Sequence, residues 1–118
     1  MAERIAHAQT ARASVESMAD ELRDLFGSRV LATILGIADA KAIRRYVLGE
    51  QRPQPSVEQH LRTCFQIAKL LQQIESASTI RAWFMGMNPL LEDRAPASLV
   101  RTEPERVMQA ARSFVAQG

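Results

Sequence analysis

The chain has 118 residues, of which 47% are hydrophobic and 24% charged, and its formal net charge is only +2. This length allows one small domain with a modest buried core, and a charge so near neutral gives the chain as a whole no electrostatic reason to bind nucleic acid. No apolar stretch has the form of a signal peptide or approaches the length of a membrane span, so we expect a soluble, cytoplasmic protein without membrane contact.

Residues 1–13 are polar and rich in alanine, and no face of this stretch is consistently apolar. We therefore expect a mobile N-terminal arm or a loosely attached helix. From Ser14 onward, apolar residues recur three and four positions apart. This spacing predicts an amphipathic helix that ends at Gly27.

Two short helices are predicted next. Ser28 can cap the first, which Gly36 interrupts, and Asp39 can cap the second, which covers residues 40–48 and ends at Gly49. A small residue where the helices cross and a glycine at the turn are typical of a helix-turn-helix. Counted from Gly36, the first inward-facing apolar residue of the second helix comes one position later than in the usual helix-turn-helix pattern. We therefore expect the turn to be one residue longer than usual.

The stretch RVLATILGIADAKAIRRYVLGEQRP resembles the Xre or Cro type of DNA-binding domain, above all in its ending YVLGEQRP, so we interpret residues 14–55 as a helix-turn-helix region. From residue 29 to residue 52 there are five cations and two acids, against ten cations and eleven acids in the rest of the chain. DNA binding needs cations at phosphates and polar side chains over base edges, although a run of charge is more often a solvated helix face. The candidate DNA-binding residues are Arg29, Lys41, Arg44, Arg45 and Arg52.

The longest predicted helix follows a connector that contains two prolines. Ser56 and Gln59 form an expected capping box, and one apolar face then continues for about five turns to Ile74. The single cysteine, Cys64, lies in this face, where we expect a small core residue. One cysteine excludes an internal disulfide and is consistent with a reducing compartment. We expect this helix to be the hub of the core.

Residues 78–100 are both apolar and irregular, and they cannot form one continuous helix. Pro89 and Pro96 each restrict the residue before them, so the chain must turn twice. Asn88 and Pro89 are a suitable N-cap and first residue for a short helical turn. The apolar side chains on this bend either complete the core or are offered to another protein, and burial statistics alone favour neither alternative.

A final helix is predicted after the bend. Thr102 and Glu105 form an expected capping box around Pro104, and the helix should run to about Ala116. No segment has the two-residue period of a strand. The expected fold class is therefore all-α, with a helix-turn-helix bundle followed by a small helical module.

The order of Trp83, Phe84 and Met85, then NPLLEDRAPASLVR, then a helix bearing Val107, resembles the toxin-binding domain of the MbcA/ParS/Xre family of antitoxins. The resemblance implies that residues 56–118 form a long connecting helix and a toxin-binding domain. It also implies a partner, a RES-domain toxin that degrades NAD⁺, whose active site the antitoxin would cover without any chemistry of its own.

Candidate partner-binding residues follow from the resemblance and, for the last helix and the tail after it, from their position at a free chain end. Arg94 could reach a partner with its planar guanidinium, or it could brace the bend by bonding to backbone carbonyls. The candidates are Trp83, Met85, Asn88, Pro89, Leu90, Arg94, Pro96, Arg101, Arg112 and Phe114.

The sequence contains no arrangement that indicates catalysis. His7 and His60 have no second histidine or cysteine at metal-ligand spacing, and the adjacent Glu92 and Asp93 are better explained as a solvated turn. There is also no glycine-rich phosphate loop. We therefore expect no enzyme activity, no cofactor, no metal and no small-molecule substrate.

Two functions from different classes remain open. The first is an antitoxin that neutralises a RES-domain toxin and binds operator DNA to regulate its own operon. The second is a stand-alone helix-turn-helix transcription regulator whose C-terminal part serves dimerisation alone. Both predict a homodimer, because one helix-turn-helix contacts too few phosphates for useful affinity.

Overall fold

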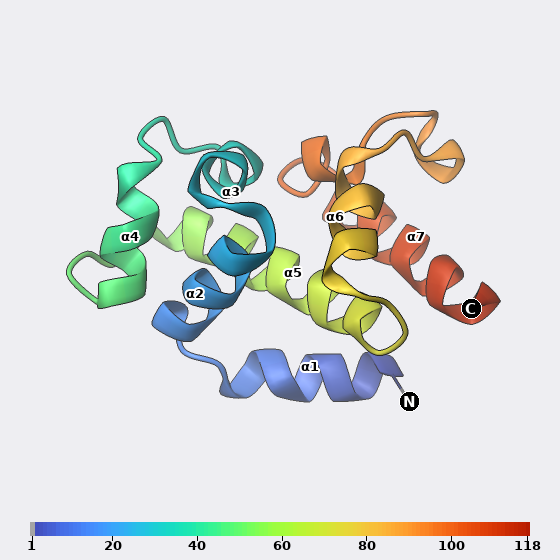
Figure 1. Ribbon diagram of the computed structural model, residues 1–118, viewed down its shortest axis with the longest axis horizontal. Helices are drawn as coiled ribbons and strands as arrows, with labels where there is room; N and C mark the ends of the chain where they lie inside the picture. Colours follow the sequence, from blue (N-terminus) through green and yellow to red (C-terminus); the bar gives the residue numbers. More distant parts are fainter. Residues whose placement is uncertain (1) are drawn as a thin grey trace.

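The longest helix, α5 (Pro55–Gln72), runs through the middle of the molecule, and the other helices are arranged around it (Figure 1). The computed structural model describes residues 2–118 and confirms the all-α fold class, since these residues form no strand and a single isolated β-bridge. None of the described helices is long and apolar enough to cross a membrane. The other elements are α1 (Ala2–Arg12), α2 (Val15–Phe26), α3 (Ser28–Leu35), α4 (Lys41–Leu48), α6 (Ala77–Met85), the 3-10 turns η1 (Pro89–Leu91) and η2 (Pro96–Ser98), and α7 (Pro104–Gln117).

Helices α2, α3 and α4 begin and end largely where local chemistry predicts. The Ser14 hydroxyl accepts an N–H of the first turn of α2 at 3.1 Å. Gly36 and Gly49 adopt the left-handed conformation that ends α3 and α4, which glycine reaches without a steric penalty. The prediction that Ser28 caps α3 is wrong, because Ser28 is already in the helix and Gly27 is its N-cap.

Five residues, 36–40, separate α3 from α4. The usual helix-turn-helix turn has about three or four residues. The prediction that Asp39 is the N-cap of α4 is one residue off, because Ala40 holds that position; the Asp39 carboxylate still accepts the Lys41 N–H at 2.9 Å. This hydrogen bond and Gly36 together set where α4 begins.

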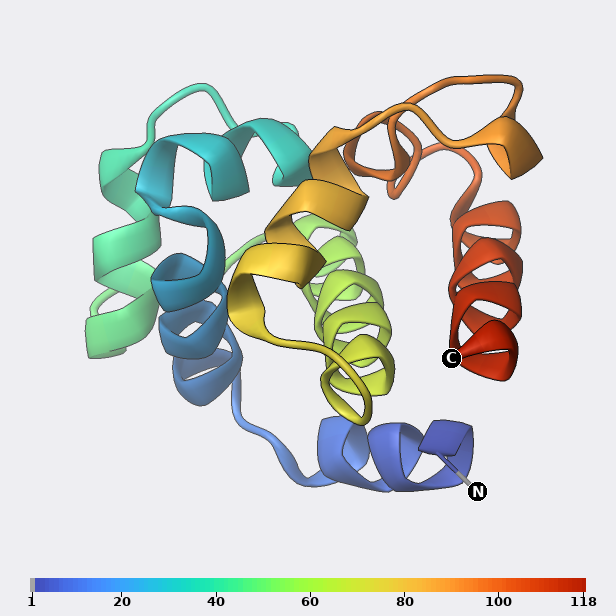
Figure 2. The ribbon, with the colours of Figure 1, turned by 45° about the vertical axis from the view of Figure 1, so that its right-hand side comes forward.

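The N-terminal residues form a helix that is docked against α5 (Figure 2). Ala6 is fully buried, and Arg62 of α5 donates hydrogen bonds to the carbonyls of Thr10 and Ala13 at 3.4 and 3.5 Å. Of the two expected alternatives, a mobile arm or a loosely attached helix, residues 2–12 form a helix, and the arginine that bonds to it lies about fifty positions away in the sequence. Met1 lies outside the described residues.

The apolar face of α5 is buried over most of its predicted length, from Leu61 to Leu71. Cys64 is fully buried in this face, as expected of a core residue. The capping box expected at Ser56 is not formed: the helix begins at Pro55, which lacks an N–H to satisfy, and no side chain caps it.

Helices α6 and α7 complete the core beside α5. The Ser76 hydroxyl caps α6, and the Phe84 ring of this helix meets the Phe26 ring of α2 edge to face at 5.0 Å. The second predicted capping box is also wrong, because Glu103, with no side-chain cap bond, is the N-cap of α7. One cluster of buried side chains includes residues from all seven α-helices, so the core continues across the expected boundary after residue 55.

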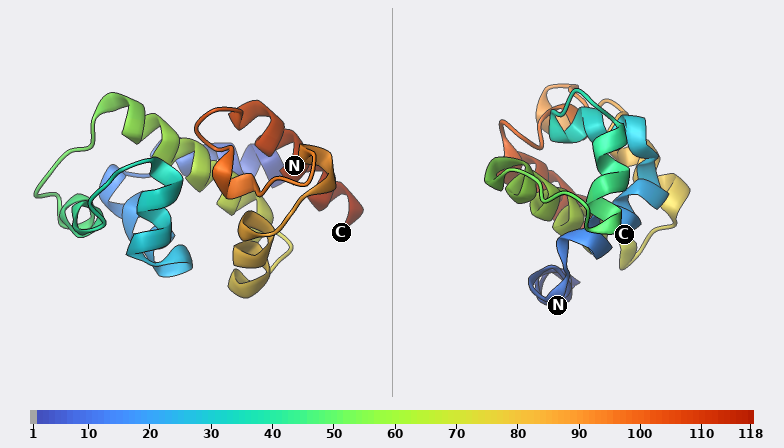
Figure 3. Two further views of the ribbon diagram at one scale, coloured as in Figure 1. Left: turned by 90° about the horizontal axis from the view of Figure 1, so that it is seen from above. Right: turned by 90° about the vertical axis from the view of Figure 1, so that its left-hand side faces the viewer.

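The molecule is elongated, with a long axis of 40 Å. Seen from above, α4 lies at one end, whereas both termini and the end of α7 lie at the other (Figure 3). The candidate DNA-binding helix and the candidate partner-binding region are therefore far apart.

Candidate functional site

The bend between α6 and α7 is held by Asn88. Its side-chain oxygen accepts the Leu90 N–H at 2.9 Å, which caps η1, and its backbone N–H donates to the Arg94 carbonyl at 3.2 Å. Glu92 and Asp93, between these bonds, have φ values of 53° and 62°, a left-handed conformation that costs non-glycine residues energy. The surrounding bonds keep this loop in one conformation.

Replacing Asn88 with alanine should lower the free energy of unfolding by about 1 kcal/mol, because the Leu90 N–H loses its acceptor. Urea denaturation followed by circular dichroism measures this change. A variant as stable as the wild type would contradict the role of the cap.

An ion-pair network ties the bend to α7. Arg94 bonds to Glu92 at 2.8 Å and to Glu103 at 2.9 Å, and Arg106 bonds to both carboxylates at 3.0 Å. The Arg94 Nε–H also donates to the Leu91 carbonyl at 3.1 Å, and Arg106 donates to the Leu90 carbonyl at 3.3 Å. Two roles were considered for Arg94, and the structure shows the second of them: the guanidinium braces the bend by donating to a backbone carbonyl.

This network predicts a pH-dependent stability. Hydrogen bonds from Arg106 are the main reason why the pKa of both Glu92 and Glu103 lies below the usual 4.5, and Arg94 adds to the effect. Because the folded-state pKa is the lower one, the stabilisation is present above about pH 4.5 and is lost as the pH falls through the folded pKa. The melting temperature of the wild type should therefore fall more between pH 5 and 3 than that of a Glu92→Gln, Glu103→Gln variant. Equal slopes in thermal melts would contradict this.

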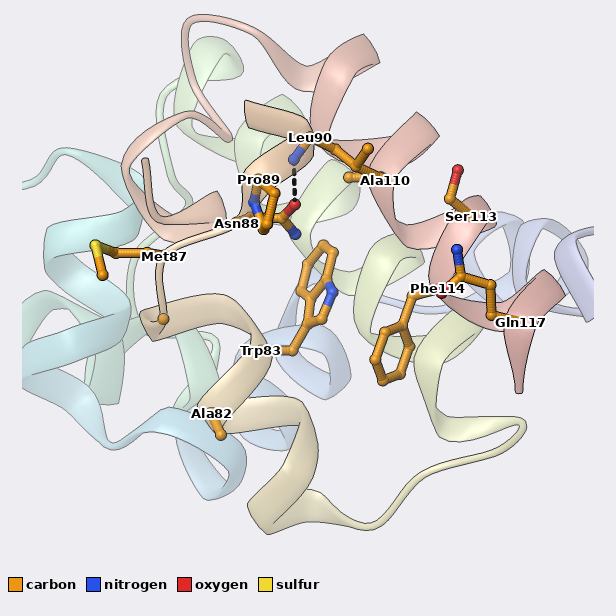
Figure 4. Close-up of a pocket in the computed structure, with 11 residues that line it drawn as sticks. Ala82, Trp83, Met87, Asn88, Pro89, Leu90, Ala110, Ser113, Phe114 and Gln117 are labelled. Atoms are coloured by element: carbon orange, nitrogen blue, oxygen red, sulfur yellow. Dashed lines mark hydrogen bonds between the residues drawn. The ribbon is translucent and has the colours of Figure 1, made fainter. Parts of the chain in front are cut away.

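An apolar groove lies between this bend and α7. It encloses about 420 Å³ and is lined from α6, η1, the residues between them and the last two turns of α7. Figure 4 shows Trp83 and Phe114 side by side in the groove; their ring centroids are 6.4 Å apart. The lining residues are Ala82, Trp83, Gly86, Met87, Asn88, Pro89, Leu90, Ala110, Ser113, Phe114 and Gln117.

The apolar residues of the bend divide into two sets. Phe84 and Leu91 are fully buried, so they complete the core. Leu90 is 56% exposed and Met87 80% exposed, while Trp83 is half-buried against the core. Some apolar residues of the bend therefore complete the core, and others stay exposed at the surface.

Five of the ten candidate partner-binding residues line the groove: Trp83, Asn88, Pro89, Leu90 and Phe114. Met85 is 52% exposed just before the bend but is outside the lining. Pro96 is buried at the start of η2, so its role is structural. Arg101 and Arg112 line a different hollow, and Arg112 pairs with Glu3 of α1 at 2.7 Å.

Sequence reasoning missed several residues at this site. Ala110, Ser113 and Gln117 lie at helical spacing on the same face of α7 as the predicted Phe114, and this pattern could have identified the α7 wall of the groove. The bracing role of Arg106 had no comparable signal, because its partners on the irregular loop are fourteen and sixteen positions away.

A second candidate surface is the cationic face of α4. Lys41 and Arg44 are exposed and form no ion pair within residues 2–118. Together with Arg45 they border a surface hollow that also includes Ser28, at the start of α3. Arg29, the next residue, is exposed on the same first turn of α3.

The other two candidate DNA-binding residues are engaged within the chain. Arg45 pairs with Asp39 at 3.3 Å and donates to Gln51 at 2.7 Å. The pKa of Asp39 is lowered first by the backbone hydrogen bond from Lys41 and then by this arginine. Arg52 pairs with Glu58 at 3.2 Å, although its side chain stays largely exposed. Arg45 and Arg52 thus have less free charge to offer an anion than Lys41 and Arg44.

The described side chains offer little for covalent or metal chemistry. Complete burial raises the pKa of the Cys64 thiol to about 12, so it is a poor nucleophile. Within residues 2–118 no group of three histidine, cysteine, aspartate or glutamate side chains is arranged to hold a metal ion.

Comparison of the chain with family models, with curated proteins and with solved structures found no match.

Proposed function

We propose that this protein is an antitoxin that binds a RES-domain toxin through the groove between the bend and α7 and thereby covers the toxin's NAD⁺ site. The observation that carries the proposal is the exposure of Leu90 and Met87 beside an apolar groove formed by Trp83 and Phe114. In this proposal the protein contributes no catalytic group. The toxin class comes from the sequence resemblance, and the binding surface from the groove.

The exposed side chains can supply substantial binding free energy. Fully burying a leucine or methionine side chain contributes about 1.5–3 kcal/mol. Arg94 and Arg106 already hold the bend through its ion pairs and through the Leu90 and Leu91 carbonyls. A braced surface loses little conformational entropy on binding, so more of the contact energy appears as affinity.

In the same proposal, α4 binds operator DNA, so that the protein regulates its own operon. Lys41 and Arg44 supply unpaired positive charge, and the start of α3 beside them provides backbone N–H groups that favour a phosphate. Because α4 lies at the opposite end of the molecule from the groove, DNA and toxin can be bound together (Figure 3). Operator binding of this kind requires a homodimer.

The first test is whether a RES-type reading frame lies beside this one, and the second is co-expression of the two proteins. The toxin alone should stop growth and deplete NAD⁺, and this protein should restore both. A toxin that remains lethal in its presence would overturn the antitoxin proposal. If this protein is instead a stand-alone transcription regulator, it should still slow the migration of its promoter fragment in a gel, but it should neither bind nor neutralise the toxin.

A further inference from the structure

The sulfur-containing side chains within residues 2–118 differ sharply in exposure. Met18, Cys64 and Met108 belong to the buried core, and none of them is more than 8% exposed. Met85, the last residue of α6, is 52% exposed, and Met87, two residues later on the bend, is 80% exposed. The accessible sulfur-containing side chains of the described residues are therefore gathered at one place on the surface, beside the apolar groove.

The single cysteine does not compete with these methionines for an oxidant. A thiol reacts with a peroxide as its thiolate, so its reactivity depends on ionisation and on access. Cys64 is fully buried, and this burial raises the pKa of its thiol to about 12. A thioether needs no ionisation, so access decides which methionines react. Peroxide that meets the folded chain should therefore oxidise Met87 and Met85 first.

Met87 lies on the rim of the apolar groove and is part of its lining. Its side chain extends from the bend away from Trp83 and Phe114 (Figure 4). Neither Met85 nor Met87 belongs to the buried core or to the apolar side chains packed against it. A chemical change at these two positions therefore alters the surface around the groove without removing a contact of the core.

Oxidation of a methionine by hydrogen peroxide requires no protein group besides the thioether. A lone pair of the sulfur attacks one peroxide oxygen, the O–O bond breaks, and the departing hydroxide takes the proton left on the transferred oxygen to become water. The sulfur is oxidised to a sulfoxide, and the peroxide is reduced. The product has a polar S–O bond where the apolar thioether was.

We propose that Met87, together with Met85, is a redox modification site at which a peroxide forms sulfoxides and thereby weakens the binding of an apolar partner surface at the groove. The position of the site rests on the exposure of the two methionines, and its consequence rests on the proposed toxin-binding role of the groove. Water hydrogen-bonds to a sulfoxide oxygen, and an apolar partner that covers this oxygen removes those bonds. Methionine sulfoxide reductases reverse the oxidation, so the site can be used repeatedly.

Peptide mapping by mass spectrometry after treatment of the full-length protein with hydrogen peroxide tests the position of the site. Met87 should be oxidised fastest and Met85 next, and Met18 and Met108 should react at least about tenfold more slowly because they are buried. The melting temperature of the oxidised protein should stay within about 3 °C of the untreated value, since no core contact is lost. Oxidation of Met18 or Met108 as fast as Met87, or unfolding once the bend is oxidised, would overturn the site.

Calorimetry with a catalytically inactive toxin tests the consequence, with the peroxide removed before mixing. Oxidised protein should bind the toxin about tenfold more weakly, and treatment with methionine sulfoxide reductases should restore the affinity. Unchanged affinity after complete oxidation of both methionines would overturn the regulatory role. If the untreated protein does not bind the toxin, the proposed function and this consequence fail together, and the peptide map still decides whether the bend is the modification site.

Matched leucine variants separate the bend from the core. Each variant is compared with itself before and after peroxide, so its starting affinity does not matter. The double variant Met85→Leu, Met87→Leu has no sulfur on the bend and should change its affinity less than about twofold on treatment. Met108→Leu, which removes a buried sulfur, should lose affinity about tenfold on treatment, like the wild type. Equal losses in the two variants would show that the effect of peroxide does not arise at the bend.

Discussion

Replacing Leu90 with aspartate should weaken toxin binding about 100-fold and abolish rescue of growth on co-expression, an effect equal to about 2.8 kcal/mol. Leu90 is 56% exposed and lines the groove, and Arg106 holds its carbonyl at 3.3 Å. In a complex the new carboxylate would replace an apolar side chain against Trp83, Phe114 and the partner's apolar surface, and the nearby Arg106 is already paired with Glu92 and Glu103. Calorimetry with a catalytically inactive toxin measures the loss.

The matched control is Leu48→Asp. Leu48 is 52% exposed and lies at the end of α4, at the opposite end of the molecule from the groove. Neither change removes a buried side chain, so each should alter the free energy of unfolding by no more than about 1 kcal/mol. Equal losses of affinity in both variants, or no loss in Leu90→Asp, would exclude the groove as the toxin-binding surface.

The double substitution Lys41→Ala, Arg44→Ala should weaken binding to a promoter fragment about 100-fold near 0.1 M salt. Each lysine or arginine that contacts a phosphate releases counterions on binding. In the homodimer the double substitution removes four such contacts, two in each protomer, so the slope of log K against log salt concentration should become less steep by about 3.6. Fluorescence anisotropy at several salt concentrations gives both quantities.

Two further variants test whether position or total charge matters. Arg4→Ala, Arg12→Ala removes the same charge from exposed positions on α1 and should leave DNA binding within about twofold of the wild type. Arg45→Ala should reduce DNA binding less than Arg44→Ala, because Asp39 and Gln51 already engage Arg45. If the α1 and α4 double variants weaken binding equally, α4 has no specific role in contacting DNA. If the wild type gives no retardation at low salt, the DNA proposal as a whole is lost.

The glycines and caps were predictable because their effects are local. Gly36 and Gly49 end their helices through a backbone conformation that depends on the residue itself, and the side chains of Asp39 and Asn88 accept N–H groups from residues two positions away. The same locality explains the correct all-α fold class, since helical periodicity is visible within one segment. Both predicted capping boxes failed, because Pro55 and Pro104 each take a position in the first turn and move the helix start away from the expected cap.

The sequence by itself determined the helices, the bend at Asn88 and the positive charge on α4. The tertiary structure alone decided which apolar residues of the bend stay exposed, that Arg94 and Arg106 brace the bend, and that α1 is docked against α5. It also placed Arg101 and Arg112 in a polar cleft away from the groove. The physical reason is the separation in sequence between the residues that interact. A cap or a helical face depends on neighbours within four positions. Burial and ion pairing depend on partners that can be distant in sequence, such as Glu3 and Arg112, which are 109 positions apart.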